Sequence, residues 1–214
     1  MSGTPSLDTI RSRVALPRAP VDPRARILAS IEGRIPPDLL ALVDRPSRAA
    51  SVLLTLVERA AGLTVLFTER AAHLKDHAGQ ISFPGGRIGA GESAVDAALR
   101  ETREEIGLPP ADVEVLGVLD EFLTGTGFLI RPVVGYVRRG TFVPTPDPAE
   151  VAAVFEVPLD LILDPASMTA SYRERLGARF LTYEIHHAGY RIWGATAAIL
   201  VNFRDVISND QPVR

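Results

Sequence analysis

The segment 86–108, GRIGAGESAVDAALRETREEIGL, constrains the fold of this chain more than any other. Its glycine-rich first part predicts a loop, and the remainder predicts one helix. At about 100° per residue, Glu101, Glu104 and Glu105 lie within a third of the helix circumference and form one acidic stripe. A neighbouring arc faces a core and consists of Val95, Leu99, Thr102 and Ile106. The segment therefore predicts a helix with one buried face and one face crowded with carboxylates.

The acidic stripe is unfavourable in an isolated helix. Like charges at these spacings destabilise a helix by roughly 0.2–0.5 kcal/mol per pair, and the macrodipole disfavours anions in the last turn, where Glu104 and Glu105 lie. Sequences that break local rules in this way usually do so at functional sites. A hard divalent cation with oxygen ligands, above all magnesium, would relieve the repulsion. A solvated face with ion pairs of the Arg100–Glu104 type is the alternative, and the spacing alone favours neither.

Both ends of the predicted helix carry recognisable signals. Ser93 followed by Asp96 is a beginning that resembles a capping box, and Gly107 suits the position just after the last turn. Upstream, the segments 84–86 (Pro-Gly-Gly) and 89–91 (Gly-Ala-Gly) provide a backbone that can approach a phosphate or offer a carbonyl to a metal.

Taken with its spacing, the segment resembles the Nudix box, G-x5-E-x7-R-E-U-x-E-E-x-G-U, in which U is apolar. The positions in register are Gly86, Glu92, Arg100, Glu101, Glu104, Glu105, Gly107 and Leu108. Thr102 replaces an apolar residue on the core arc, a change that should not affect the chemistry. The resemblance implies a Nudix hydrolase, which is an α/β protein with an α/β/α sandwich around a mixed β-sheet, here from Ala50 onward. It also implies metal-dependent hydrolysis of a pyrophosphate bond.

The preceding segment resembles a second signature, which marks the coenzyme A pyrophosphatase branch of the family: L-L-T-x-R-[SA]-x3-R-x3-G-x3-F-P-G-G. The matching positions are Leu66, Thr68, Arg70, Ala71, Gly79, Phe83, Pro84, Gly85 and Gly86. Phe67 replaces Leu, and Lys75 replaces Arg, which exchanges a bidentate guanidinium for a point charge. This resemblance implies cleavage of coenzyme A into 3′,5′-ADP and 4′-phosphopantetheine. The implied substrate-binding residues are Arg70, Lys75, Gly85 and Gly86.

The resemblance also gives roles to the charged residues of the box. Glu101 and Glu105 are implied to be the firmest ligands of Mg²⁺ or Mn²⁺, and Glu104 is implied to be a further ligand or the general base. Arg100 is implied to orient a catalytic glutamate, while Glu92 belongs to the loop that shapes the site. A backbone carbonyl of the Gly-Gly pair could complete the metal shell.

Glu150 is the candidate catalytic acid outside the box. In Nudix enzymes such an acid often assists the metals or the attacking water, and Glu150 lies where the resemblance would place it. It follows a proline-rich loop, residues 144–148, and precedes the apolar run 151–159. A surface glutamate that caps the next segment is the alternative.

Composition limits the partners. A formal net charge of −3 argues against a non-specific nucleic-acid binder, and no apolar run reaches the length of a membrane span. The absence of cysteine excludes disulfides and fits a reducing, cytoplasmic location. The resemblance implies a small-molecule nucleotide substrate such as coenzyme A as the partner, and a homodimer is left open.

The rest of the chain predicts one domain over residues 24–214, because no low-complexity linker divides it. Residues 1–23 contain four prolines and no apolar signal-peptide core, and they predict an irregular N-terminal arm. Trp193 is expected to anchor the core. The polar turn 124–127 could line the substrate cleft, but a plain β-turn is the default interpretation. Strands are predicted at 50–57, 63–68, 113–119, 128–137, 180–185 and 190–193, and a closing helix at 195–207.

Three alternatives compete with this interpretation. Residues 89–94 also fit the dinucleotide-binding pattern G-x-G-x-x-A, but the distance to Asp120 is too long and regular β-α alternation is missing. A Nudix-like binding module without catalysis is disfavoured because every acid of the box is present. His73 and His77 have the spacing of zinc ligands, but they lack the H-E-x-x-H pattern and are predicted to lie in a loop.

Overall fold

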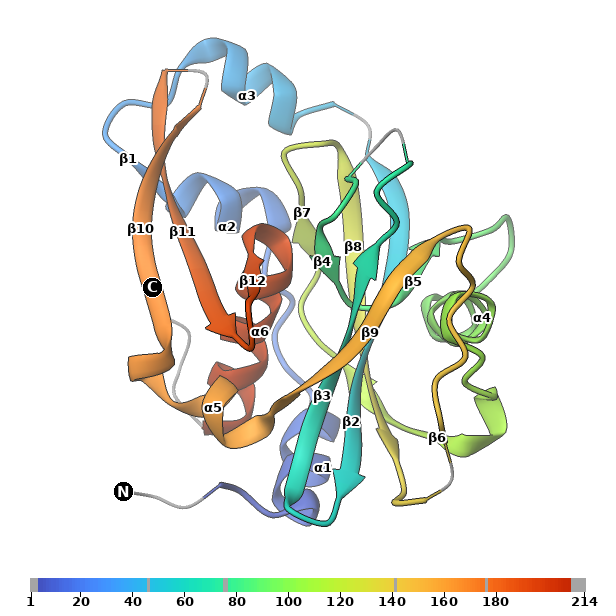
Figure 1. Ribbon diagram of the computed structural model, residues 1–214. Helices are drawn as coiled ribbons and strands as arrows, with labels where there is room; N and C mark the ends of the chain where they lie inside the picture. Colours follow the sequence, from blue (N-terminus) through green and yellow to red (C-terminus); the bar gives the residue numbers. More distant parts are fainter. Residues whose placement is uncertain (1–3, 46, 75–76, 141, 176, 209–214) are drawn as a thin grey trace.

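The computed structural model describes residues 4–208 except 46, 75–76, 141 and 176 (Figure 1). An eight-stranded mixed sheet has the order β4-β3-β2-β8-β6, and β5 also pairs with β2, β7 with β8, and β9 with β3. Its strands are β2 (Arg48–Arg59), β3 (Gly62–Arg70), β4 (Ile81–Ser82), β5 (Gly85–Arg87), β6 (Val113–Val118), β7 (Phe122–Leu123), β8 (Phe128–Val137) and β9 (Val151–Pro158). The four strands predicted between residues 50 and 137 are therefore confirmed.

Side chains of β2 alternate between the two faces of this main sheet, as a pleated strand requires. Leu53 packs against α4 (Ala94–Ile106), whereas Leu54 belongs to the cluster that contains α6 (Gly194–Ser208). Figure 1 shows α4 on one side of the sheet and α6 on the other. This arrangement confirms the predicted α/β/α sandwich around a mixed sheet. The dinucleotide-binding alternative is wrong, because β5, which leads into the glycine loop, pairs antiparallel with β2.

A second sheet of four strands lies beyond α6 (Figure 1). The predicted final hairpin is confirmed, and its turn residues Ala188 and Gly189 have φ angles of 47° and 86°. Trp193 is not a core anchor: it is 37% exposed, and two arginine guanidiniums lie over its ring. The strands of this sheet are β1 (Ile31–Glu32), β10 (Met168–Arg175), β11 (Ala178–His187) and β12 (Tyr190–Trp193).

The N-terminal segment differs from the prediction of an irregular arm. Helix α1 (Leu7–Ala15) begins after Ser6, whose hydroxyl accepts a hydrogen bond from the Thr9 N–H. Its Ile10 and Val14 are buried in the core cluster that contains α6. The four prolines do not prevent this helix because all of them lie outside it. The boundary of the predicted domain at residue 24 stays a prediction.

The remaining helical segments are short. None of the helices in the described ranges is long and apolar enough to cross a membrane. These segments are α2 (Pro23–Ala29), α3 (Pro37–Val43), α5 (Leu159–Leu163) and the 3-10 turns η1 (Pro110–Asp112) and η2 (Pro165–Ser167).

Candidate active site

Helix α4 begins and ends as its sequence predicts. The Ser93 hydroxyl oxygen accepts a hydrogen bond from the Asp96 N–H at 3.1 Å, and the hydroxyl donates to the Asp96 carboxylate at 2.6 Å. Gly107 follows the last turn with a φ of 75°. The proline-rich loop then caps the helix, because its backbone N–H groups donate to the carbonyls of Glu105 and Ile106. This loop contact had no local signal in the sequence.

The three glutamates of the predicted stripe have different environments. The Glu105 side chain is 5% exposed and that of Glu101 is 18% exposed, whereas that of Glu104 is 58% exposed. Glu104 forms an ion pair with Arg100 at 3.1 Å. This pair is the one expected if the acidic stripe were only a solvated helix face. The stripe is therefore divided into two acids directed toward the sheet and one at the surface.

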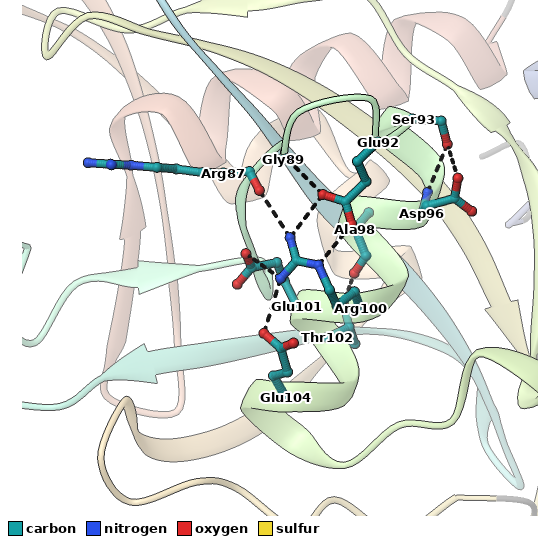
Figure 2. Close-up of polar contacts among 10 residues, drawn as sticks. All are labelled: Arg87, Gly89, Glu92, Ser93, Asp96, Ala98, Arg100, Glu101, Thr102 and Glu104. Atoms are coloured by element: carbon teal, nitrogen blue, oxygen red, sulfur yellow. Dashed lines mark hydrogen bonds and ion pairs between the residues drawn. The ribbon is translucent and has the colours of Figure 1, made fainter.

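Arg100 is the hub of the polar network shown in Figure 2. Its Nε and Nη2 atoms donate to the two oxygens of Glu92 at 2.8 and 3.1 Å. Its Nη1 atom donates to Glu101 at 2.9 Å and to Glu104 at 3.1 Å, and Nη2 also reaches the carbonyl of Arg87 at 3.1 Å. The contacts with Glu92 and then with Glu101 raise the pKa of the Arg100 guanidinium. Arg100 thus fixes the orientation of Glu101 relative to β5.

Glu92 fixes the glycine-rich loop before α4. Its carboxylate accepts the two hydrogen bonds from Arg100 and one from the Gly89 N–H at 2.8 Å. The Arg100 side chain and then the Gly89 N–H lower the pKa of Glu92 to about 2. The loop is therefore attached to the helix through an ionised carboxylate.

Glu105 is a buried carboxyl group with few partners. Its Oε2 atom accepts one hydrogen bond from the Gly85 N–H at 3.3 Å, and Arg70 Nη1 lies 3.9 Å from Oε1. Burial raises the pKa of Glu105 to about 8, although the Gly85 N–H and the Arg70 charge lower it. The nearby charges of Glu150 and Glu101 raise it further. An additional cation would stabilise the ionised form of this carboxyl group.

The adjacent glycines of β5 permit this arrangement. A Cβ atom on Gly86 would lie 2.4 Å from the carboxylate carbon of Glu101. A Cβ atom on Gly85 would lie 2.3 Å from the Ser51 carbonyl oxygen and 2.6 Å from the Val52 Cα. Gly86 therefore makes room for a site carboxylate, whereas Gly85 allows β5 to pair with β2. The structure brings both predicted glycines together with Glu101 and Glu105.

The other predicted site residues come from the loops beside Glu105. Arg70 ends β3, and its buried Nε atom has no hydrogen-bond partner within the described part of the chain. The Glu150 carbonyl accepts from the Ala71 N–H at 2.9 Å, and the predicted loop residue His73 contacts the Ala149 carbonyl at 3.0 Å. These contacts hold the segment of Glu150 next to Arg70. Lys75 lies outside the described residues.

The candidate site offers the type of ligand atom that a hard cation prefers. Glu101, Glu105 and the backbone of the glycine pair present oxygen atoms, which Mg²⁺ and Mn²⁺ prefer. Across the described ranges, no three carboxylate or histidine side chains converge into a preformed metal site. Glu104 is directed to Arg100, and its predicted role as a metal ligand stays a prediction.

Comparisons with known proteins agree with the geometry. The NUDIX domain model matches residues 45–177. Nudix hydrolase 15, mitochondrial, and Nudix hydrolase 22, chloroplastic, both from Arabidopsis thaliana, are 39% and 38% identical over 78% of this chain. The chain spans only 61% and 58% of the lengths of these two relatives.

In two further matches, the aligned region covers a larger share of the related protein. An uncharacterized Nudix hydrolase, NudL, from Pectobacterium atrosepticum is 38% identical over 78% of this chain and 85% of its own length. The crystal structure of a Nudix hydrolase from M. smegmatis, RenU, matches 79% of this chain and 91% of its own with a TM-score of 0.53 and 21% identity. The similarity to RenU shows the fold. By the family model and by its similarity to NudL, this chain belongs to the Nudix hydrolase family.

Proposed function

We propose that this protein hydrolyses the pyrophosphate bond of coenzyme A or of a coenzyme A derivative. The products would be 3′,5′-ADP and 4′-phosphopantetheine or its acyl form. The observation that carries the proposal is the buried Glu105 carboxyl group, which has one hydrogen bond at 3.3 Å and lies beside the Glu101 helix face and the glycine pair. Membership of the Nudix hydrolase family supports a pyrophosphohydrolase.

A Mg²⁺ or Mn²⁺ ion is the proposed cofactor. Glu101 and Glu105 would hold it, with Glu104 and a carbonyl of Gly85 or Gly86 as further ligands. The bound cation would neutralise negative charge on the diphosphate and polarise its phosphoryl oxygens. An additional positive charge would also favour the ionised form of Glu105, which burial disfavours.

The side chains of the site would orient the reactants and move a proton. A diphosphate repels an incoming hydroxide, so the attacking water must lose its proton next to the phosphorus atom. Glu104 or Glu105 is the proposed proton acceptor, and Glu150 is the proposed assisting acid. Arg100 contributes by holding Glu101 at 2.9 Å, which limits the directions in which that carboxylate can point.

The second signature motif supports coenzyme A as the substrate. Its Arg70 lies beside Glu105, where a guanidinium can bind a substrate phosphate. Lys75 is the other proposed phosphate-binding side chain. The alternative is a pyrophosphatase that acts on another nucleoside diphosphate derivative, because neither sequence motif identifies residues that would bind the pantetheine arm.

The test compares wild type with Glu105→Gln on a panel of coenzyme A species and other dinucleotides. With magnesium, we expect wild type to release 3′,5′-ADP from coenzyme A, as identified by mass. Glu105→Gln should lower kcat by about 10²-fold or more, and EDTA should abolish turnover. Equal rates for both proteins would contradict the metal and base assignments. A wild type that binds but never cleaves the panel would favour the non-catalytic module.

Two further proposals concern the location and the assembly state of the whole protein. A cytoplasmic location is proposed from the composition, while two related plant proteins are named mitochondrial and chloroplastic. A homodimer is proposed as one assembly state, and light scattering of the purified protein would determine its mass. Neither proposal changes the assignment of the site residues.

A further inference from the structure

Two arginines lie on one face of the main sheet, at the end where β5 meets β2. Arg87 of β5 is opposite Ala50 of β2, and Arg48 of β2 is opposite Phe128 of β8. Opposite residues share a face of the sheet, and so do residues two apart in one strand. Arg48 and Arg87 are therefore diagonal neighbours, about 7–8 Å apart at their backbones, which is within reach of long side chains.

The two arginines lie on the face of the sheet opposite to the one that α4 and its Glu101 cover. Gly86 precedes Arg87 and pairs with Ser51, and a Cβ atom on Gly86 would meet the Glu101 carboxylate. Side chains of adjacent strand residues point to opposite faces, so Arg87 points away from Glu101. Figure 2 shows the Arg87 side chain extended away from the Arg100 network. Gly86, which faces Glu101, is the residue next to Arg87 in β5.

Both guanidiniums are available to an anion. Arg87 is exposed, and its side chain makes no hydrogen bond or ion pair with any residue in the described ranges. Arg48 is also exposed, donates to the Thr126 carbonyl at 3.1 Å and lies 4.0 Å from the ring centroid of Phe128. Within the described ranges, neither has a carboxylate partner, whereas Arg131 on the other face of β8 is paired with Glu121.

The contact with Phe128 and Thr126 orients Arg48 before any ligand arrives. A guanidinium held flat on a ring loses less side-chain entropy when it binds, and its remaining N–H groups form a fork that matches a phosphate. Arg87 is attached to the catalytic network through its backbone, because its carbonyl accepts from Arg100 Nη2 at 3.1 Å. The Arg87 backbone is thus held relative to the helix that carries Glu101, and its side chain is free to turn toward an anion.

We propose that Arg48 and Arg87 form a second anion-binding subsite, which binds a phosphomonoester that the substrate carries apart from its diphosphate. This inference rests on the proposed function, because the 3′-phosphate of coenzyme A is such a group. A substrate that crosses the glycine pair of β5 places its diphosphate beside the carboxylates on one face and its phosphomonoester between the arginines on the other. The subsite selects nucleotides that carry the extra phosphate.

The first test measures binding without turnover. Calorimetry in magnesium-free buffer compares adenosine 3′,5′-bisphosphate with adenosine 5′-phosphate. We expect wild type to bind the bisphosphate more tightly. Arg87→Gln and Arg48→Gln should each weaken bisphosphate binding about tenfold or more, since a charge-assisted hydrogen bond is lost, and should leave monophosphate binding nearly unchanged. Arg173→Gln, an equal change in charge on the second sheet, should leave both affinities unchanged.

The second test measures kcat/KM with magnesium for coenzyme A and for its 3′-dephospho form. The two variants should lose activity selectively on the 3′-phosphorylated substrate, while their melting temperatures stay at the wild-type value. Equal losses on both substrates, or equal weakening of both nucleotides, would overturn the subsite, and so would no loss at all. If wild type cleaves neither compound, the proposed function fails, while the calorimetric comparison still decides whether the subsite exists.

Discussion

At the residue scale, Gly86 and Gly85 are both needed in β5, but for different reasons: Gly86 leaves space for a side chain and Gly85 for a neighbouring backbone. Gly86→Ala places a Cβ atom 2.4 Å from the carboxylate carbon of Glu101, so the Glu101 side chain must move off its contact with Arg100. Glu101 is a proposed metal ligand, and misplacement of a catalytic group by about 1 Å can cost on the order of 10²-fold in rate. We expect kcat to fall by about that factor with a small change in melting temperature, measured in parallel.

Gly85→Ala is the contrasting change. Its Cβ atom would meet backbone atoms of Ser51 and Val52 at 2.3 and 2.6 Å, and backbone cannot rotate aside as a side chain can. We expect this variant to lose folded protein as well as activity, as seen by circular dichroism. Two variants with the same loss of stability would contradict the separation of roles.

The lowered pKa of Glu92 predicts that part of the folding stability is lost at acidic pH. Its folded pKa of about 2 lies below the ordinary 4.5, so folding favours the ionised form. The contribution is present above pH 4.5 and is lost as the pH falls toward 2. The difference in stability between wild type and Glu92→Gln should be greatest near pH 6 and should shrink on acidification. Melting curves from pH 6 to pH 2 measure it, and a difference independent of pH would contradict the ion pair with Arg100.

The individual roles of the acids were only partly predictable from the sequence. Helical periodicity placed Glu101, Glu104 and Glu105 on one stripe, and the helix geometry agrees. Which acid is buried depends on elements far away in sequence, because Gly85 of β5 and Arg70 of β3 lie beside the Glu105 carboxylate, whereas Glu104 is exposed. Periodicity carries no information about those neighbours.

At the element scale, the N-cap of α4 determines how firmly the site helix begins. Ser93→Ala removes the acceptor for the Asp96 N–H and the hydroxyl that donates to the Asp96 carboxylate. Loss of a serine cap costs about 1 kcal/mol. We expect that decrease in the free energy of unfolding in urea titrations. Ser12→Ala is the control, since the Ser12 hydroxyl donates to the Thr9 carbonyl within α1 and caps no N-terminus. A loss no larger in Ser93→Ala than in the control would contradict the capping role.

Elements with strong local signals were predicted, and elements defined by tertiary contacts were not. Helix α4 has a cap at each end and an apolar arc, and β2 and β3 are apolar runs around a tight turn. Strand β10, MTASYRER, is polar and lies at the edge of the second sheet, where pairing with β11 alone defines it. The second sheet was therefore foreseen only as its final hairpin.

At the scale of the whole molecule, the N-terminal helix closes one side of the main sheet. Val14 of α1 lies so close to β6 that a Cβ atom on Gly117 would be 2.9 Å from a Val14 methyl group and 3.0 Å from the Val14 carbonyl oxygen. Composition pointed to an irregular arm because prolines flank this segment. The short pattern of α1 has only two buried positions, which is too little periodicity to recognise without the surface that it covers.

The burial of α1 makes it part of the folded core, although it lies outside residues 45–177 that match the family model. Ile10 is fully buried, and Ile10→Ala should lower the free energy of unfolding by about 2–5 kcal/mol through lost burial and a cavity. Leu16→Ala removes the same kind of side chain where it is 55% exposed, and it should cost far less. Because α1 contacts mainly β6 and α6, kcat measured well below the melting temperature should stay at the wild-type value in both variants. Equal stabilities would show that α1 is not packed as described, whereas a fall in kcat would show that the N-terminal helix also positions the carboxylates.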